Sequence, residues 1–299
     1  MSAQLTVVKR KPGYSKWLRV LMYSFLTALA LAWLVPVGGA LYASFRPYQE
    51  TQTKGIFSWP DSLTVSNYSD AFTQGDMKKT FLNTAFIVFP AIVLILLMSS
   101  FMAFAVSRFS FRFNIALLLL FTAGNLLPAQ VLFQPLFQMF KAMPWPDVLS
   151  DTDTGSLLGT KIAVIIVHVA FQTGFCTFVL SNYMKTIPKE LNEAALVDGA
   201  SVPRIFFQVI MPLCRPALAA LATLEFTWLY NDFFWAVVLL NRGSERPITS
   251  SIANLGGQFF TNDNLVAAAS MIVAMPTLLV YLILQKQFIS GLTLGASKG

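Results

Sequence analysis

Six long apolar stretches recur along the chain, and they limit what it can fold into more than any other feature. They cover residues 20–42, 80–107, 113–140, 162–184, 216–240 and 264–285. A helix that crosses a bilayer needs about 20 predominantly apolar residues, and each stretch is long enough. The sequence therefore predicts an all-α polytopic membrane protein with six transmembrane helices.

Composition points to the same class. Hydrophobic residues make up 56% of the chain and charged residues 12%, whereas a soluble domain carries about 25% charged residues. The net charge is +7, but in a membrane protein lysine and arginine mostly mark which loops are cytoplasmic. We therefore do not interpret this charge as a nucleic-acid interface. Cys176 lies in an apolar stretch and Cys214 lies beside a polar loop, and these positions favour neither a disulfide nor a metal site.

The distribution of basic residues predicts the orientation. With six spans both termini share one side, where the segments hold 13 lysines and arginines against 8 on the other side. Cytoplasmic loops are enriched in these residues, so both termini are predicted to be cytoplasmic. Lys78 and Lys79 lie on the opposite side and weaken the bias. The first stretch is too long for the apolar part of a cleaved signal peptide, so it is interpreted as a retained anchor.

The segment between the fourth and fifth stretches predicts two short helices outside the bilayer. Pro188 fits the first position of a helix, and Glu193 lies early enough to favour the helix dipole. Gly199 is the expected left-handed cap of that helix. Pro203 fits the first turn of a second helix, which Pro212 is expected to close.

The same segment resembles the EAA loop of the permeases of ABC importers. Val209 and Met211 stand where that family has isoleucine and leucine. The resemblance implies a coupling helix that docks on a cytoplasmic ATPase subunit, through Glu193, Ala194, Ala195, Asp198, Gly199 and Pro212. The alternative is an ordinary interfacial helix, which would show a basic face and bulky anchors rather than alanines and carboxylates.

The fifth stretch is unusual because it contains acidic and amide side chains among aromatic ones. A carboxylate at mid-membrane costs about 2.5–3.5 kcal/mol, so these groups are expected to face a cavity or another subunit. Helical spacing puts Trp228 and Phe234 on the face of Asn231 and turns Asp232 about 100° away. We assign a sugar path to Asn231, Trp228, Phe234 and Tyr230, and polar contacts between helices to Asp232 and Glu225. The alternative is an aromatic belt with interhelical hydrogen bonds.

Two further resemblances narrow the family. Residues 226–240 resemble the fifth span of carbohydrate-type permeases, with Tyr230 where tryptophan is usual. The last nine residues are similar to the tail of the smaller, MalG-like permease of maltose-type transporters, which implies an ATPase-interface role for Gly291, Thr293, Gly295 and Lys298. The family implies a homologous second permease, an ATPase dimer that binds ATP and Mg, and an extracytoplasmic sugar-binding protein.

Polar residues in the third and fourth stretches leave alternatives open. Those of the third stretch indicate a face that does not touch lipid, and they are Asn125, Pro128, Gln130 and Gln134. His168 in the fourth stretch either hydrogen-bonds a neighbouring helix or relays protons. A proton-coupled secondary transporter would use Asp232, Glu225 and His168, but the sequence shows no inverted repeats. A scaffold without transport would not need acids in the fifth stretch.

No catalytic motif is visible, and no glycine-rich phosphate loop occurs, so the chain is predicted to be a transport subunit without cofactor or metal. ATP hydrolysis would belong to a partner. The expected organisation is a cytoplasmic segment 1–19, a first transmembrane helix 20–43, an extracytoplasmic loop 44–79, a five-helix permease core 80–284 that includes the coupling loop 185–215, and a cytoplasmic tail 285–299. The expected location is the bacterial cytoplasmic membrane, in contact with lipid.

Overall fold

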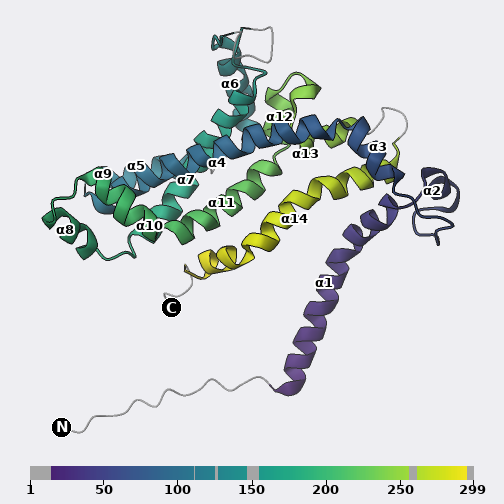
Figure 1. Cartoon of the computed structure of the whole chain (residues 1–299), viewed down its shortest axis with the longest axis horizontal. Helices are drawn as coiled ribbons and strands as arrows, with labels where there is room; N and C mark the ends of the chain where they lie inside the picture. Colours follow the sequence, from purple (N-terminus) through teal and green to yellow (C-terminus); the bar gives the residue numbers. More distant parts are fainter. Residues whose placement is uncertain (1–14, 111, 125–126, 147–154, 256–260, 295–299) are drawn as a thin grey trace.

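Four long helices lie side by side and form the body of the molecule. A computed structural model describes residues 15–110, 112–124, 127–146, 155–255 and 261–294. The body consists of α4 (Met77–Arg108), α7 (Lys161–Met184), α11 (Arg215–Tyr230) and α14 (Asp263–Leu294) (Figure 1). The core fills the space between them with buried aliphatic side chains such as Ile95, Leu180 and Leu221. The described residues include no β-strand beyond an isolated bridge between Pro144 and Ser156.

The first helix, α1 (Lys16–Ser44), stands apart from this body (Figure 1). Ser44 at its end is its single buried residue. It meets the bundle at the start of α14, where the Asn264 amide donates to the Ala43 carbonyl at 2.8 Å. The apolar side chains along the rest of α1 therefore need lipid or another subunit to cover them.

The loop after α1 folds around a buried arginine. It contains α2 (Tyr48–Lys54) and α3 (Ser66–Gln74). The Arg46 side chain is fully buried and donates to the carbonyls of Gly55 and Ile56, to the Ser58 hydroxyl and to the Glu50 carboxylate. The hydrogen bond and charge of Arg46 hold the pKa of Glu50 below its ordinary value.

The predicted spans are only partly continuous helices. Spans one, two, four and six are single helices, α1, α4, α7 and α14. The third is divided into α5 (Asn114–Ala123) and α6 (Ala129–Ala142), and α6 points away from the bundle (Figure 1). The fifth ends as α11 at Tyr230 and resumes as the short α12 (Phe234–Leu239). Among the described residues, four helices are long and apolar enough to cross a membrane, or five if one bent pair counts as a span.

The breaks have local causes. Pro128, which has no N–H to donate, precedes the first residue of α6. After α11 the Asn231 amide donates to the Thr227 carbonyl at 2.7 Å, and the Asp232 carboxylate accepts from the first N–H groups of α12. Side chains that bond backbone groups in this way end one helix and begin the next.

One glycine allows two helices to touch. A Cβ at Gly174 of α7 would lie 1.8 Å from the Phe121 carbonyl oxygen of α5. Only a residue without a side chain fits at this crossing, because the neighbour is backbone and cannot move aside.

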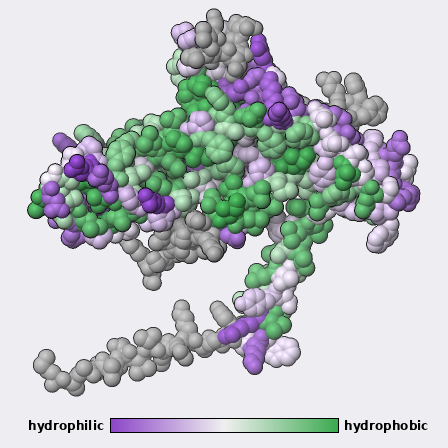
Figure 2. Space-filling view, in the orientation of Figure 1, coloured by the Kyte–Doolittle hydropathy of each residue, from purple (hydrophilic) through white to green (hydrophobic). Residues whose placement is uncertain are grey.

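The remaining short elements connect the long helices. They are α8 (Glu190–Val197), α9 (Val202–Arg204), η3 (Ile205–Ile210), α10 (Met211–Leu213), η4 (Gly243–Glu245), α13 (Ile248–Ser251) and η5 (Ile252–Leu255). Figure 2 shows hydrophobic residues along the bundle on the visible face and hydrophilic residues gathered over α8 at one end and over α2 at the other. This is the distribution of a membrane protein whose two ends contact water.

Candidate functional site

The helix α8 ends in a complete glycine cap. Gly199 has φ +78°, the left-handed conformation expected from the sequence. Its N–H donates to the Leu196 carbonyl at 3.0 Å, and the Ala200 N–H donates to the Ala195 carbonyl at 2.9 Å. These two bonds form a Schellman motif, which satisfies carbonyls that the helix end would leave free. A Cβ at Gly199 would meet no atom within 4 Å, so backbone conformation alone selects glycine here.

Two details of this loop differ from the sequence prediction. Pro188 is not the first helical residue, because Lys189 is the N-cap and α8 begins at Glu190. Pro212 does not end the second helix, which continues to Leu213 before the chain bends by 73° into α11. A proline cannot donate to the carbonyl four residues before it, and the segment that precedes it, η3, is π-helical.

The outward surface of α8 is left open by this chain. Glu193, Ala194, Asp198 and Gly199 are exposed, and Ala195 is half-buried against the core. Val197 is 88% exposed. In the part of the chain that the structure describes, Glu193 has neither an ion pair nor a side-chain hydrogen bond. Apolar and acidic side chains thus share one uncovered surface of a short, capped helix.

A hollow of about 230 Å³ lies between α8 and the end of α4, and it is open to the surface that carries Glu193. Glu193 and Leu196 line it from α8, and Arg108 lines it from α4. The Arg108 guanidinium donates to the carbonyls of Met184 at 3.0 Å and Ile187 at 3.2 Å, which fixes the end of α7 to the end of α4. The sequence does not predict this role of Arg108, because its partners are backbone atoms more than 70 residues away.

The acidic residues of the fifth predicted span lie in different surroundings. Glu225 is completely buried, and one carboxylate oxygen lies 3.1 Å from the Cys176 sulfur of α7, which donates to it. The Asp232 carboxylate lies 3.6 Å from His168 Nε2, also on α7. It accepts from the N–H groups of Trp235 at 3.4 Å and Ala236 at 3.1 Å. Both acids therefore connect the α11–α12 segment to α7.

The sequence predicted that Trp228, Asn231 and Phe234 share one face of a continuous helix. This prediction was wrong, because α11 ends at Tyr230, before Asn231, and Phe234 belongs to α12. Asn231 is exposed beside the break, and Trp228 is 43% exposed and packs against Phe175. Tyr230 is only 3% exposed, and its hydroxyl donates to the Val273 carbonyl of α14 at 2.8 Å. Tyr230 is thus a packing residue in this structure rather than part of an open path.

The C-terminal residues are described only in part. Gly291 and Thr293 lie in the last turns of α14, which extends to Leu294, beyond the predicted end of the sixth span. Gly295 and Lys298 lie outside the described residues. Among the residues that are described, no cluster of three or more His, Cys, Asp or Glu could hold a metal ion.

A comparison with protein families identifies one match over most of the chain. The family described as "Binding-protein-dependent transport system inner membrane component" matches residues 95–293. The matched range includes α7, the capped helix α8, the segment from α9 to α10, and the break between α11 and α12.

Individual relatives match along nearly the whole length. A probable ABC transporter permease protein of Pyrococcus horikoshii is 32% identical over 270 residues, which cover 89% of this chain and 92% of that protein. The arabinooligosaccharides transport system permease protein AraQ of Halalkalibacterium halodurans is 30% identical over 296 residues, which cover 98% of this chain and 100% of that protein. Among solved structures, a chain of a bacterial ABC transporter involved in the import of the acidic polysaccharide alginate is similar, with a TM-score of 0.76 and 21% identity over 93% of this chain and 100% of that chain. At 21% identity this structural likeness shows that the two chains share a fold, and nothing more.

Proposed function

The chain belongs to the family of binding-protein-dependent transport system inner membrane components, and on this basis we propose that it is a permease subunit of a bacterial ATP-driven importer of a sugar or oligosaccharide. It is a transport component of the membrane and not an enzyme. The proposal of a saccharide substrate rests on relatives such as the arabinooligosaccharide permease AraQ, whose match covers 98% of this chain. ATP and Mg belong to a partner ATPase, and the sugar arrives on an extracytoplasmic binding protein.

The observation that carries the coupling role is the uncovered surface of α8. Its residues Glu193, Ala194 and Val197 are exposed, and its end is fixed by the Gly199 cap. A short rigid helix with apolar and acidic groups free for a partner suits docking into a cleft of the ATPase subunit. The acid at Glu193 would pair with a basic residue or with backbone N–H groups of that partner.

The connections of α8 explain how a push on it would reach the spans. The π-helical segment η3 buries Ile205, Phe206 and Ile210 in the core, and Arg108 holds the α4 and α7 ends together. Movement of α8 would therefore be transmitted to α4, α7 and α11 as rigid bodies. When ATP closes the ATPase dimer, the two permeases would reorient around a central path, a rigid-body switch.

Several finer assignments belong to this proposal. The importer has a homologous second permease and two ATPase subunits, and this chain has six spans with both termini in the cytoplasm. Asn231, Trp228 and Phe234 contribute to the path, while Asp232 and Glu225 hold α11 and α12 to α7. Gly291, Thr293, Gly295 and Lys298 contact the ATPase pair. A proton-coupled secondary transporter is not supported, because the family and the relatives are permeases of ABC transporters.

The test is reconstitution with the partners. The chain should co-purify with an ATPase, and the cognate binding protein should stimulate ATP hydrolysis when loaded with one sugar of a panel of oligosaccharides. Gly199→Val should abolish most uptake, since a β-branched residue at positive φ costs about 1–2 kcal/mol. Gly199→Asn is the matched control and should retain uptake, because asparagine tolerates the left-handed conformation. Normal uptake in Gly199→Val would remove the role of the cap, and a complex without any ATPase would refute the function.

A further inference from the structure

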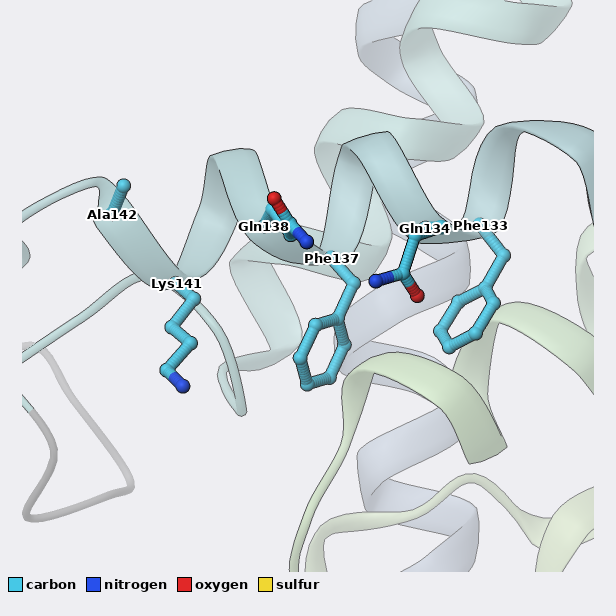
Figure 3. A pocket seen from close by; sticks show the side chains of 6 residues that line it. All are labelled: Phe133, Gln134, Phe137, Gln138, Lys141 and Ala142. Carbon is cyan, nitrogen blue, oxygen red and sulfur yellow. The ribbon is translucent and has the colours of Figure 1, made fainter.

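The helix α6 carries a surface that the coupling and path residues do not use. A hollow of about 610 Å³ lies along it, within the range of small-molecule sites in proteins. Figure 3 shows the side chains that line it, which are Phe133, Gln134, Phe137, Gln138, Lys141 and Ala142. All of them come from α6.

Helix geometry separates this surface from the packed side of α6. Leu132, Leu136 and Phe140 recur every four residues and pack on the core. The lining residues occupy the two following rows: Gln134, Gln138 and Lys141 are exposed, whereas Phe137 is half-buried and also touches the core. The rings of Phe133 and Phe137 lie 5.8 Å apart at an interplanar angle of 64° and project on one side of the helix (Figure 3).

The polar side chains of this surface have no partners among the residues that the structure describes. Gln134, Gln138 and Lys141 are exposed, and within the described residues none of them makes a side-chain hydrogen bond or an ion pair. Exposed amides without partners are costly in hydrocarbon. This surface of α6 therefore meets water or a polar ligand rather than lipid tails.

The chemistry of the lining selects the ligand. Two aromatic rings offer flat apolar faces, two amides offer both donors and acceptors, and one ammonium offers three donors. A saccharide needs this combination, since its CH faces are apolar and its rim carries hydroxyl groups. We propose that the α6 hollow is a saccharide subsite, in which Phe133 and Phe137 stack on the sugar, Gln134 and Gln138 bond hydroxyls, and Lys141 bonds a hydroxyl or a sugar carboxylate.

The place of the hollow suits such a role. The helix α6 packs against α12, which begins at Phe234 directly after the break that exposes Asn231. Phe137 borders the same core cluster as Trp235 of α12. The helix that lines the hollow thus packs against the helix that follows the break, and the subsite extends the proposed path. This inference rests on the proposed sugar import.

Transport kinetics of the assembled importer test the subsite. The wild-type complex is first screened for uptake of raffinose, melibiose, maltotriose and arabinotriose, and one transported sugar is chosen. Phe137→Ala and Gln138→Ala should each raise the KM for that sugar about tenfold. Gln130→Ala, an exposed amide on the same helix that does not line the hollow, should leave the KM unchanged. Unchanged KM values in all three variants overturn the subsite, whereas a wild-type complex that transports no sugar overturns the proposed function instead.

A labelling experiment distinguishes direct contact from a change in structure. The two cysteines of the chain, Cys176 and Cys214, are buried, so a cysteine introduced by Gln138→Cys is the exposed thiol of this chain. In the assembled complex, a membrane-impermeant maleimide should label it about tenfold more slowly when the transported sugar is present. Gln130→Cys should show no dependence on sugar. Labelling of Gln138→Cys that ignores the sugar overturns the proposal, and so does an absence of labelling in both conditions, which would mean that another subunit covers this surface.

Discussion

The two ends of the helix bundle are stabilised in different ways. At the end that carries α2 and α3, buried polar side chains make several hydrogen bonds within the chain. Arg46 makes four hydrogen bonds to different residues, and Asn264 bonds the Ala43 carbonyl and the Thr51 hydroxyl. The loop after α12 is held in the same manner, because the Asn83 amide donates to the carbonyls of Ser244 and Arg246.

At the opposite end, α8 is rigid but incompletely covered. Its last carbonyls are satisfied by the Gly199 cap, yet Glu193 and Val197 are exposed and lack partners among the described residues. Polar pairing within the chain thus shapes one end, whereas the other end presents a rigid helix with exposed side chains. Substitutions at the first end should therefore act on stability, and substitutions at the second end on coupling.

The largest loss of stability is expected from Arg46→Met. The change removes four hydrogen bonds: it leaves the Ile56 carbonyl without a donor, while the Gly55 carbonyl, the Ser58 hydroxyl and the Glu50 carboxylate keep one other bond each. A hydrogen bond contributes about 0.5–1.5 kcal/mol, so the loss should be about 3 kcal/mol. Thermal unfolding of the solubilised complex measures it. Lys54→Met removes an exposed ion pair with Asp61 and serves as the control, with an expected loss below about 1 kcal/mol. Equal stability of the two variants would contradict the comparison.

A smaller loss is expected from Asp232→Ala. This carboxylate precedes the N-cap Phe233 and accepts from the N–H groups of Trp235 and Ala236, as a capping side chain does, and loss of such a cap costs about 1 kcal/mol. The amount of complex recovered by co-purification should fall, with uptake per complex little changed. Asn231→Ala should leave the amount of complex unchanged and lower the uptake per complex. The Asn231 side chain is exposed, and its hydrogen bond is to the turn that precedes it. If Asp232→Ala assembles fully and uptake alone falls, the two roles are exchanged.

A still smaller effect, visible in its pH dependence, is expected from Glu245→Gln. Partial burial opposes the charge of Glu245, but the Lys161 ammonium at 2.5 Å and the Lys79 ammonium at 3.3 Å together hold the pKa of this carboxylate below its ordinary value. A carboxylate with a lowered pKa stabilises the folded state above the unfolded pKa of about 4.3, and this contribution is lost as the pH falls through the lowered value. The difference in folding stability between wild type and the glutamine variant should therefore disappear in that acidic range. The difference at neutral pH should be at most about 1 kcal/mol.

The smallest change in stability, with a large change in function, is expected from Glu193→Lys. The side chain is exposed and unpaired in the described structure, so thermal unfolding should shift by less than about 0.5 kcal/mol. ATP turnover should no longer drive uptake, because the lysine would face the basic residue or N–H groups of the ATPase that are proposed to pair with Glu193. A compensating charge reversal in the ATPase should restore transport. Cross-linking that placed position 193 far from every partner would refute the role of α8.

Features that depend on neighbours along the chain could be predicted from the sequence. The apolar stretches are long enough to predict the helices α1, α4, α7 and α14, because helix formation in a membrane depends on length and hydropathy. Gly199 was predictable as a left-handed cap for the same reason, since capping involves residues within one turn. The resemblance of the segment from Glu193 to Pro212 to the EAA loop of ABC importer permeases indicated the family, and the family match over residues 95–293 confirmed it.

Pairings between residues distant in sequence could be seen only once the helices were packed. The Asp232 carboxylate, which bonds the start of α12, also lies beside His168 on another helix. The partner of Glu225 is Cys176, 49 residues away, and Gly174 is required because the Phe121 backbone crosses it. Such pairings arise when helices pack, because a buried acid or a close helix crossing is stable only with one particular neighbour, and hydropathy along the chain does not identify that neighbour.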